Sequence, residues 1–177
     1  MHTTAGSEAL ADNFARKDAP LVKQLRKAGA VILGKANLSE FARYIAQEFP
    51  DGYSSRCGQV KNPYDASFPV SGSSSGSAAA AAGCFCSAAV GTETAGSITY
   101  PSIFSGICGL KPTVGLVSRS GIIPICGQDT AGPMARTVTD CAILLSAMTT
   151  GPDADDAATG CTEHLIQKDY TAFLKPE

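Results

Sequence analysis

The alternation of apolar and polar positions predicts a helix close to the start of the chain, over residues 18–28. Its apolar side chains recur at the spacing of one helical face, with basic residues and a glutamine opposite, and Gly29 follows directly. The apolar members of this face are Leu21, Val22, Leu25 and Ala28. The next four residues, 30–33, are apolar without interruption, which predicts a buried strand. Asn37 and Glu40 then have the spacing of a capping box at the start of a second helix.

The middle of the chain predicts a loop, a helix and a strand in succession. Residues 47–72 contain three prolines and no sustained periodicity, which is typical of a long loop packed over a domain. A run of alanines predicts a closely packed helix from Ser75 to Gly83, and the segment 86–92 predicts the next strand. Beyond Ser97, apolar runs cut by glycine and proline indicate irregular core segments and short strands, GIIPIC at 121–126 among them.

The last part of the chain predicts one long helix and a less regular tail. Residues 137–151 have helical periodicity and end in a glycine. The acidic segment 152–161 predicts an exposed linker, and residues 162–177 predict one more short helix. Together these elements predict an α/β fold class, a mixed sheet covered by helices. We expect residues 1–150 to form the core part of one domain, and residues 151–177 to add an acidic linker and a short helix to the same domain.

Charge excludes some classes of partner. The chain has 14 lysines and arginines and 16 acidic residues, with a formal net charge of -2 and neither a basic stripe nor an acidic tail. Nucleic acid and anionic membranes are therefore not expected as partners. Charged residues make up only 17% of the chain, which indicates that part of its surface packs against something else.

The cysteines and the first residues bear on the compartment. Seven cysteines are an odd number, and several lie in apolar runs, where a thiol acts as a small hydrophobic group. Their spacing, with only two histidines in the chain, suits neither a metal site nor a redox motif, so we expect no metal and no cofactor. The first residues lack the features of a signal peptide, and no apolar run reaches membrane-spanning length. The sequence thus predicts a cytoplasmic protein with no membrane anchor.

Two clusters of glycine and serine, at 71–77 and 94–98, carry the candidate chemistry. Such clusters often form linkers or ordinary turns. Here both run into apolar segments, so their backbone N–H groups are expected inside the fold, where they need partners. Their small side chains would let a substrate approach the backbone closely. Neither cluster contains a phosphate-binding glycine motif.

A nucleophile elbow is one interpretation of the first cluster. Residues 72–76 match G-x-S-x-G, and Asp140 and His164 follow in the order serine, acid, histidine. An elbow needs a hydrophobic strand before the turn, whereas the segment before 72–76 contains a proline and polar residues. His164, in addition, lies in a polar tail. The match therefore gives this interpretation little support.

Taken together, the two clusters closely resemble the core of the amidase signature family. The block that carries the likeness reads GSSSGSAAAAAGCFCSAAVGTETAGSITYPSIFSGICGLKPTVGLVS. The likeness continues upstream through DAPLVKQLRKAGAVILGKANLSEFA and NPYD, and downstream through GPMARTVTDCAILLSAM, covering roughly residues 3 to 150. The resemblance implies the amidase signature fold, of which this chain would hold a central, incomplete part.

The resemblance implies a role for each serine. It makes Ser97 the nucleophile, and it makes Ser73, preceded by a cis peptide bond, the relay that passes the proton of Ser97 to a lysine. Ser74 matches a family position that hydrogen-bonds within this triad. A serine hydroxyl needs an adjacent base, and a buried, uncharged lysine can be that base. The backbone N–H groups that match the family's oxyanion hole are those of Thr94, Ala95, Gly96 and Ser97.

The implied reaction is the hydrolysis of the C–N bond of a small-molecule carboxylic amide, through an acyl-enzyme on Ser97 and without a cofactor. Two other hypotheses stay open. The chain could belong to an amidotransferase subunit that releases ammonia from glutamine for a partner subunit, or it could be an inactive remnant that lacks the catalytic lysine.

The chain departs from the family pattern at several positions. The family's lysine would fall just upstream of Met1, so we expect the chain to be a truncated form of the domain, and no lysine in it matches that motif. Glu93 stands where an aspartate is usual and Thr99 where an arginine is usual, so the ion pair beneath the serine loop must be replaced by another support. Ala95 replaces a usual glycine, which requires a negative φ.

Overall fold

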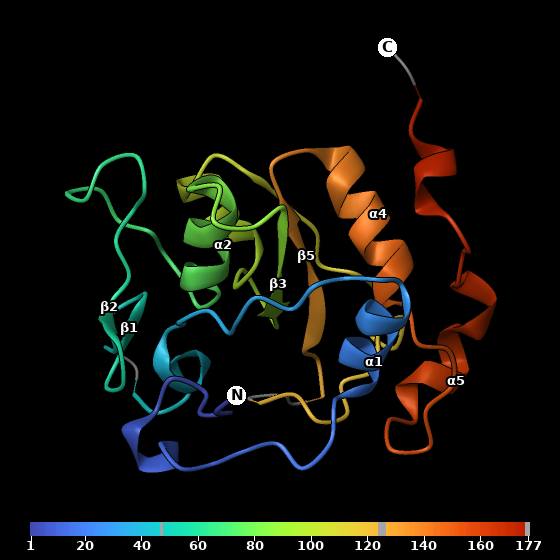
Figure 1. Ribbon diagram of the computed structural model, residues 1–177, viewed down its shortest axis with the longest axis horizontal. Coiled ribbons are helices and arrows are strands. Elements are labelled where there is room, and N and C mark those ends of the chain that lie inside the picture. The colour runs from blue at the N-terminus through green and yellow to red at the C-terminus, as the bar shows by residue number, and fades with distance from the viewer. Residues whose placement is uncertain (47, 124–126, 176–177) are drawn as a thin grey trace.

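The computed structural model describes residues 1–46, 48–123 and 127–175 (Figure 1). Three strands form its central sheet, in the order β3 (Ala88–Glu93), β5 (Thr130–Ala135) and β4 (Cys108–Gly109). Both strand pairs are antiparallel, and the register of the longer pair runs from Ala88 opposite Ala135 to Glu93 opposite Thr130. β5 is buried along its whole length, as expected for the central strand of a covered sheet.

Helices cover both faces of this sheet. They are α1 (Pro20–Lys27), α2 (Ser75–Ala82), α3 (Thr99–Phe104) and α4 (Val138–Met148). Ala131 and Met134 differ in parity along β5, so they point to opposite faces. Ala131 belongs to the core cluster formed with α1 and α4, whereas Met134 packs with Ala78 of α2 and with Ile98. Figure 1 shows α2 and α4 on either side of the β3–β5 pair. The α/β fold class expected from the sequence is thus confirmed.

Short elements complete the chain. β1 (Tyr53–Ser54) and β2 (Gly58–Gln59) pair as a separate antiparallel hairpin, and α5 (Ala158–Thr162) follows α4. The 3-10 turns are η1 (Glu8–Leu10), η2 (Glu40–Arg43), η3 (Glu163–Leu165) and η4 (Tyr170–Phe173). Within the described residues, no helix is both long and apolar enough to cross a membrane.

Four predictions from periodicity are confirmed with small shifts of their ends. The helix expected over 18–28 is α1, and the alanine run forms α2. The strand expected over 86–92 is β3, and the helix expected over 137–151 is α4, capped by the Thr137 hydroxyl. Each of these segments packs on the sheet or is part of it, so the local pattern and the tertiary environment agree.

Two predictions in the first 45 residues were wrong. Residues 30–33 form no strand, because Val31 and Leu33 are 81% and 71% exposed and only Ile32 packs against the core. Asn37 caps no helix. Its side chain accepts a hydrogen bond from Ser54 Oγ and donates to the Gly58 carbonyl, which ties it to the β1–β2 hairpin.

Two later predictions also need correction. Residues 99–104 form a helix rather than an irregular segment or strand, with Pro101 in its first turn, where proline is tolerated. The exposed linker expected over 152–161 contains a buried residue, Asp156, and ends in α5. The end of GIIPIC, including Cys126, and residues 176–177 lie outside the described residues. The division into 1–150 and 151–177 stays a prediction.

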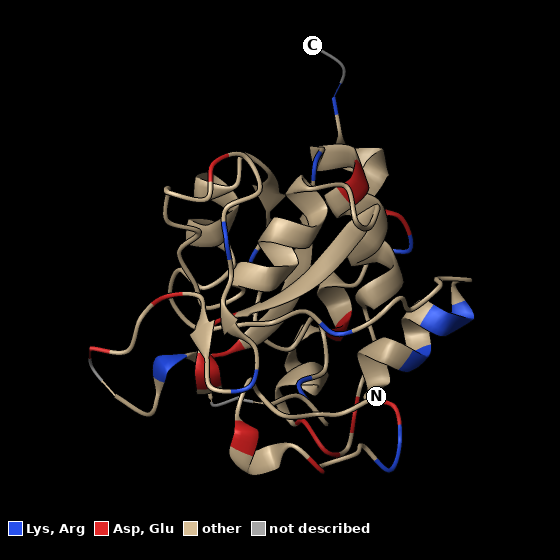
Figure 2. Cartoon of the chain, turned by 60° about the vertical axis from the view of Figure 1, so that its left-hand side comes forward, with Lys and Arg blue, Asp and Glu red and all other residues tan. Residues whose placement is uncertain are grey.

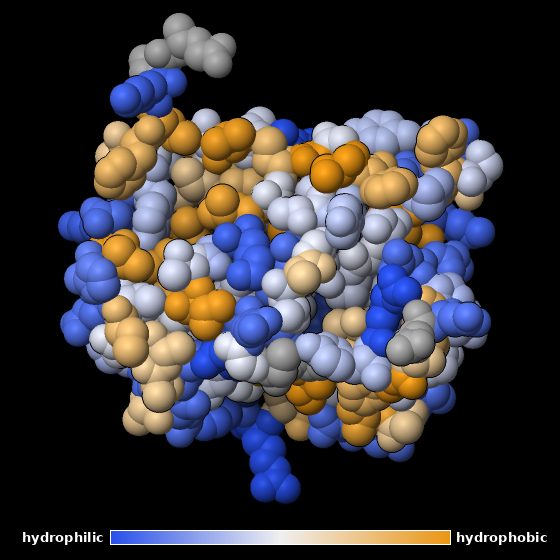
Figure 3. All heavy atoms as spheres, turned by 180° about the vertical axis from the view of Figure 1, so that it is seen from behind, coloured by the Kyte–Doolittle hydropathy of each residue, from blue (hydrophilic) through white to orange (hydrophobic). Residues whose placement is uncertain are grey.

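The surface carries many apolar side chains and few charges. Figure 2 shows lysine, arginine and acidic residues interspersed along a chain that is mostly uncharged. Seen from behind, apolar residues lie among polar ones across the face (Figure 3). The most exposed large apolar side chains are Val31, Leu33, Tyr64, Phe85 and Ile103. The low proportion of charged residues thus corresponds to apolar surface that the described chain leaves uncovered.

Candidate active site

The two serine clusters are joined by hydrogen bonds at the edge of β3. The Ser74 N–H donates to the Ser97 carbonyl at 3.0 Å. The Ser74 hydroxyl donates to the Thr92 carbonyl and accepts from the Thr92 N–H, each at 3.0 Å. Gly91 permits this approach, since a Cβ there would lie 2.8 Å from Ser74 Oγ and 2.6 Å from Met134 Sδ. Both hydrogen bonds of the Ser74 hydroxyl go to the backbone of β3, so this side chain fastens the first cluster to β3, while the Ser74 N–H joins it to the second cluster.

Ser73 is buried, with 2% of its surface exposed, and the peptide bond that precedes it is cis. Its carbonyl accepts a hydrogen bond from the Ser39 N–H at 3.0 Å. Its hydroxyl has no hydrogen-bond partner among the described residues. Gly72 has no room for a side chain, because a Cβ there would lie 2.3 Å from Ser39 Oγ. The backbone of Ser73 is thus held in place while its hydroxyl remains unpaired.

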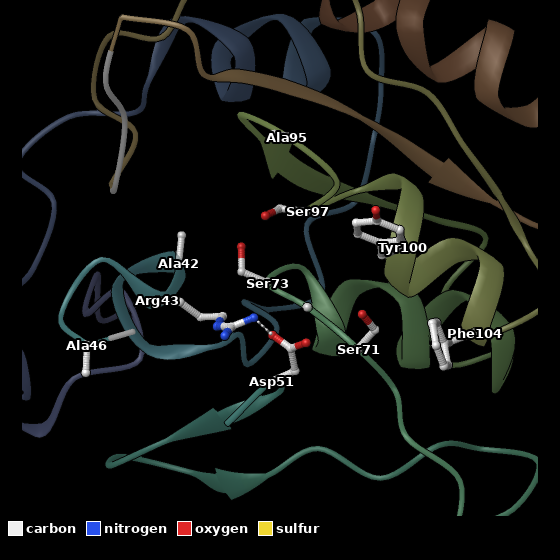
Figure 4. Close-up of a pocket in the computed structure, with 11 residues that line it drawn as sticks. Ala42, Arg43, Ala46, Asp51, Ser71, Ser73, Ala95, Ser97, Tyr100 and Phe104 are labelled. Atoms are coloured by element: carbon white, nitrogen blue, oxygen red, sulfur yellow. Dashed lines mark hydrogen bonds and ion pairs between the residues drawn. The ribbon is translucent and has the colours of Figure 1, made fainter. Parts of the chain in front are cut away.

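Ser97 lies in the loop that connects β3 to α3 and is partly buried. Its hydroxyl makes no hydrogen bond to the part of the chain that the structure describes. Figure 4 shows the side chains of Ser73 and Ser97 at the same cleft. The cleft has a volume of about 550 Å³, and its remaining lining residues are Ala42, Arg43, Ala46, Asp51, Ser71, Gly72, Ala95, Tyr100 and Phe104.

A smaller cleft of about 170 Å³ adjoins the first at Ser73, Ala95 and Ser97. Asp129 and Thr94 line it, and the Thr94 hydroxyl donates to the carboxylate of Asp129. Asp129 is only 3% exposed and directly precedes β5. This hydrogen bond therefore ties the start of the serine loop to the central strand.

The loop from Thr94 to Ser97 presents backbone donors at the cleft. The N–H groups of Ala95 and Ser97 donate to no acceptor within the described ranges of the chain. Gly96 has φ +95, and a Cβ there would lie 2.3 Å from the ring of Tyr100, so this position requires glycine. The φ of Ala95 is not positive. An alanine can therefore stand at this position, where the family usually has glycine.

Glu93 supports this loop from beneath. Its carboxylate accepts the N–H of Ile98 at 2.7 Å and that of Thr99 at 2.8 Å, and the Thr99 hydroxyl lies 3.2 Å away. Burial by itself raises the pKa of Glu93. Hydrogen bonds from backbone N–H groups, that of Gly96 first and then those of Thr99 and Ile98, outweigh burial and hold this pKa below its ordinary value. Glu93 thus remains a carboxylate, and backbone N–H groups replace the missing arginine as its partners.

The nucleophile elbow is not what the structure forms. Asp140 accepts a hydrogen bond from the Thr137 hydroxyl at the start of α4, and His164 lies in η3. Neither residue lines the clefts, and the hydroxyl of Ser74, the serine of that motif, is bound to β3. None of the chain's lysines, all of which the structure describes, lines either cleft. Lys35 instead donates to the Thr3 hydroxyl, and partial burial lowers its pKa.

Several cleft residues escaped the sequence analysis. They are Arg43, Asp51, Tyr100, Phe104 and Asp129. Tyr100 and Phe104 could have been found from their helical spacing after Ser97, had α3 been predicted. The other three come from loops and turns, and only the tertiary structure brings them to the serines. Within the described residues, no group of three or more His, Cys, Asp or Glu side chains could hold a metal ion.

Comparison with known proteins places this chain in a family. The family model for Amidase matches residues 1–176. A relative from Arabidopsis thaliana described as a probable amidase is 46% identical over 175 residues, which cover 98% of this chain and 34% of the relative. A glutamyl-tRNA(Gln) amidotransferase subunit from Cupriavidus necator is 45% identical over 172 residues, covering 97% of this chain and 33% of that protein.

The solved structures agree with this assignment. The native peptide amidase from Stenotrophomonas maltophilia matches with a TM-score of 0.86 and 56% identity, over 90% of this chain and 32% of that one. The chain therefore belongs to the amidase family, as its resemblance implied. It spans about one third of the length of the curated relatives it matches.

Proposed function

We propose that this chain carries the serine machinery of an amide hydrolase, with Ser97 as the nucleophile and Ser73 as the proton relay. The observation that carries the proposal is that both hydroxyls lie at one cleft and that no described residue hydrogen-bonds to either of them. A buried hydroxyl such as that of Ser73 usually has a hydrogen-bond partner. Two unpaired serine hydroxyls at one cleft therefore support a reactive role.

The reaction begins when Ser97 Oγ attacks the carbon of the substrate carboxamide. The proton of Ser97 passes to Ser73, which gives its own proton to a base. The carbonyl oxygen becomes an oxyanion, which the N–H groups of the Thr94–Ser97 loop stabilise. Those of Ala95 and Ser97 have no other acceptor among the described residues. Each such donor typically contributes about 3 kcal/mol to transition-state stabilisation.

The C–N bond then breaks while Ser73 returns a proton to the leaving nitrogen, which departs as ammonia or an amine. The acyl group remains on Ser97 as an ester. Water attacks this ester, gives its proton back through Ser73, and releases the carboxylic acid. Ser97 thereby regains its hydroxyl, and the cycle needs no redox partner or metal ion to balance.

We assign the role of the base to none of the described residues that line the clefts. The amidase resemblance implies a lysine for this role. Because no lysine lines the clefts, we expect the chain as it stands to acylate slowly. A small primary amine such as propylamine has the chemistry of a lysine side chain. We expect it to accelerate the reaction by entering the space next to Ser73.

A fluorophosphonate probe tests the nucleophile, because it forms a covalent P–O bond with a reactive serine as fluoride leaves. We expect slow labelling of the unmodified chain, faster labelling with added propylamine, and none in Ser97→Ala. Ser73→Ala should remove the acceleration by the amine. The matched control is Ser105→Ala, which removes the other buried hydroxyl without a partner among the described residues and should label normally. Undiminished labelling of Ser97→Ala would overturn the proposal.

An amidotransferase subunit is the second candidate, and the Cupriavidus necator relative named above favours it. In that role the same serines would act on glutamine, and a partner subunit would receive the ammonia. Release of glutamate from glutamine only in the presence of a co-purifying second subunit would support this candidate. An inactive remnant would instead show broad thermal unfolding, dye-binding apolar surface and no labelling of Ser97.

The six cysteines that the structure describes are free, which supports a reducing, cytoplasmic location.

A further inference from the structure

Two cysteines that lie far apart in the sequence share one face of the central sheet. Cys108 in β4 is paired with Ala135 in β5, and directly opposite residues of an antiparallel pair point to the same face. Ala131, four residues before Ala135, points to this face as well and belongs to the core cluster that contains Leu145 of α4. The Cys108 side chain is therefore directed at the face of the sheet that α4 covers.

Cys141 approaches the same space from the helix. It is buried on α4 together with Leu145 and Met148, and their spacing places all three on the helix face that packs on the sheet. α4 contacts both β5 and β4, and it lies along β5 (Figure 1). The Cys141 thiol donates to the Cys108 carbonyl, with 3.5 Å between the sulfur and the oxygen. The two residues, 33 positions apart in the chain, are thus in direct contact.

The two thiols differ in exposure. Cys108 lies on an outer strand of the described sheet and is partly exposed, whereas Cys141 is only 5% exposed. Burial, and after it the proximity of Cys108, raises the pKa of the Cys141 thiol to about 11, so Cys141 is uncharged at neutral pH. A small reagent in solution would therefore reach Cys108 first, with Cys141 directly behind it.

We propose that Cys108 and Cys141 are a thiol pair that peroxide oxidises to a disulfide between β4 and α4. Cysteines that sense oxidants often lie next to a second cysteine that resolves the first product. Cys108 has the position of the first and Cys141 that of the second. Because Cys141 Sγ already touches the backbone of Cys108, rotation of the Cys108 side chain about its Cα–Cβ bond would bring the two sulfurs together. Neither cysteine lines the serine clefts, so this site does not depend on the proposed function.

The reaction consumes one molecule of hydrogen peroxide. The Cys108 thiolate attacks one peroxide oxygen, the O–O bond breaks, and the leaving hydroxide takes up the proton that Cys108 has lost. Cys108 is thereby oxidised to a sulfenic acid. The Cys141 sulfur then attacks the Cys108 sulfur, and the S–S bond forms as the S–O bond breaks. The hydroxyl group leaves as water with the proton of Cys141, so two thiols and one peroxide give one disulfide and two waters.

Peptide mapping of the oxidised chain tests the pair. The folded chain is treated with hydrogen peroxide, the remaining thiols are blocked, and the digest is analysed by mass spectrometry before and after reduction with dithiothreitol. We expect one linked pair of peptides, containing Cys108 and Cys141, that disappears on reduction. The same treatment in urea should give mixed cysteine pairs, because the unfolded chain does not hold these two residues together.

Three results would overturn the pair. The first is a folded chain in which Cys108 stays reduced under peroxide, and the second is one in which it is oxidised without a bond to Cys141. The third is the same mixture of linked peptides from the folded and the unfolded chain, because the fold would then not direct the pairing.

Two variants separate the roles of the cysteines. In Cys141→Ala the sulfenic acid on Cys108 has no resolving partner, so dimedone should label Cys108 strongly here and only weakly in the parent. In Cys108→Ala the buried Cys141 should stay reduced. Cys84→Ala is the matched control, because it removes an exposed cysteine that follows α2, and it should form the Cys108–Cys141 bond as the parent does. Equal dimedone labelling of the parent and Cys141→Ala would refute the role of Cys141.

The bond should also change the stability of the chain. It would join residues 33 positions apart and so restrict the unfolded state. The midpoint of urea unfolding should therefore be higher for the oxidised parent than for the reduced parent, and dithiothreitol should reverse the shift. Cys108→Ala should show no such shift. A lower midpoint for the oxidised parent would mean that the folded geometry does not accept the bond.

Discussion

At the scale of single residues, Glu93 is the main support of the serine loop. The family pattern has an acid and an arginine here, whereas this chain has Glu93 and Thr99. The structure explains how both changes are tolerated together. The glutamate side chain accepts the N–H groups of Ile98 and Thr99, and the Thr99 hydroxyl adds a third contact. With the N–H of Gly96 as a further donor, one buried carboxylate thereby fixes residues on both sides of Ser97 without a cationic partner among the described residues.

This support predicts the effect of replacing Glu93. Glu93→Ala should lower the free energy of unfolding by about 3 kcal/mol, because it leaves buried N–H groups without an acceptor. Glu93→Gln keeps one acceptor oxygen and should lose about half as much. Since the pKa of Glu93 is lowered in the fold, its contribution is present above the ordinary glutamate pKa and is lost as the pH falls through the lowered value. Urea unfolding of the three chains at several pH values measures these effects. A Glu93→Ala chain as stable as the parent would contradict this account.

At the scale of elements, the contact of α2 with β3 brings the two serine clusters together. The alanine run gives α2 a small surface, and Ser77 adds a hydrogen bond from its hydroxyl to the Val90 carbonyl at 2.8 Å. Gly91 permits their close approach, since a Cβ there would meet Ser74 and Met134. The small residues of this sequence therefore set the distance between helix and strand, and with it the position of Ser73 relative to Ser97.

Gly91→Ala tests this packing. We expect a loss of about 2 kcal/mol in the free energy of unfolding and slower labelling of Ser97, because the added methyl group separates α2 from β3. Gly160→Ala is the matched control. A Cβ at Gly160 in α5 meets nothing within 4 Å, so this change should leave labelling unaffected and stabilise the chain by up to about 1 kcal/mol. Equal behaviour of the two variants would refute this role of Gly91.

At the scale of the whole molecule, a buried ion pair fastens the C-terminal segment to the core. Arg119 donates to Asp156 through its backbone N–H at 2.9 Å and its Nε at 2.8 Å, and the Asp156 side chain is 3% exposed. Hydrogen bonds from the Arg119 side chain are the main cause that lowers the pKa of Asp156 to about 2. The tail is therefore tied to the core through a carboxylate that must stay ionised.

Acid should loosen this connection. Because the pKa of Asp156 is lower in the fold than in the unfolded chain, its stabilisation is complete above about pH 4 and is lost as the pH falls towards 2. The loss should reach about 2 kcal/mol. Asp156→Asn should be less stable than the parent at pH 7 and should show a flatter pH dependence, measured by urea unfolding. Asp155→Asn, at an exposed neighbouring carboxylate, should follow the parent. Identical pH profiles for Asp156→Asn and the parent would exclude this role.

The sequence by itself determined the elements whose pattern and environment agree, and the residues whose spacing carries a family likeness. The periodicity of α1 and α4 and the alanine run of α2 were sufficient to predict these helices, and the family resemblance that the two serine clusters carry made Ser73 and Ser97 the candidate site residues. The tertiary structure decided the rest. Whether the run 30–33 pairs as a strand depends on what covers it, and here Val31 and Leu33 remain exposed. Arg43, Asp51 and Asp129 reach the two clefts from a 3-10 turn and from separate loops. Only folding brings these segments together with the serines, because local periodicity carries no information about contacts between segments.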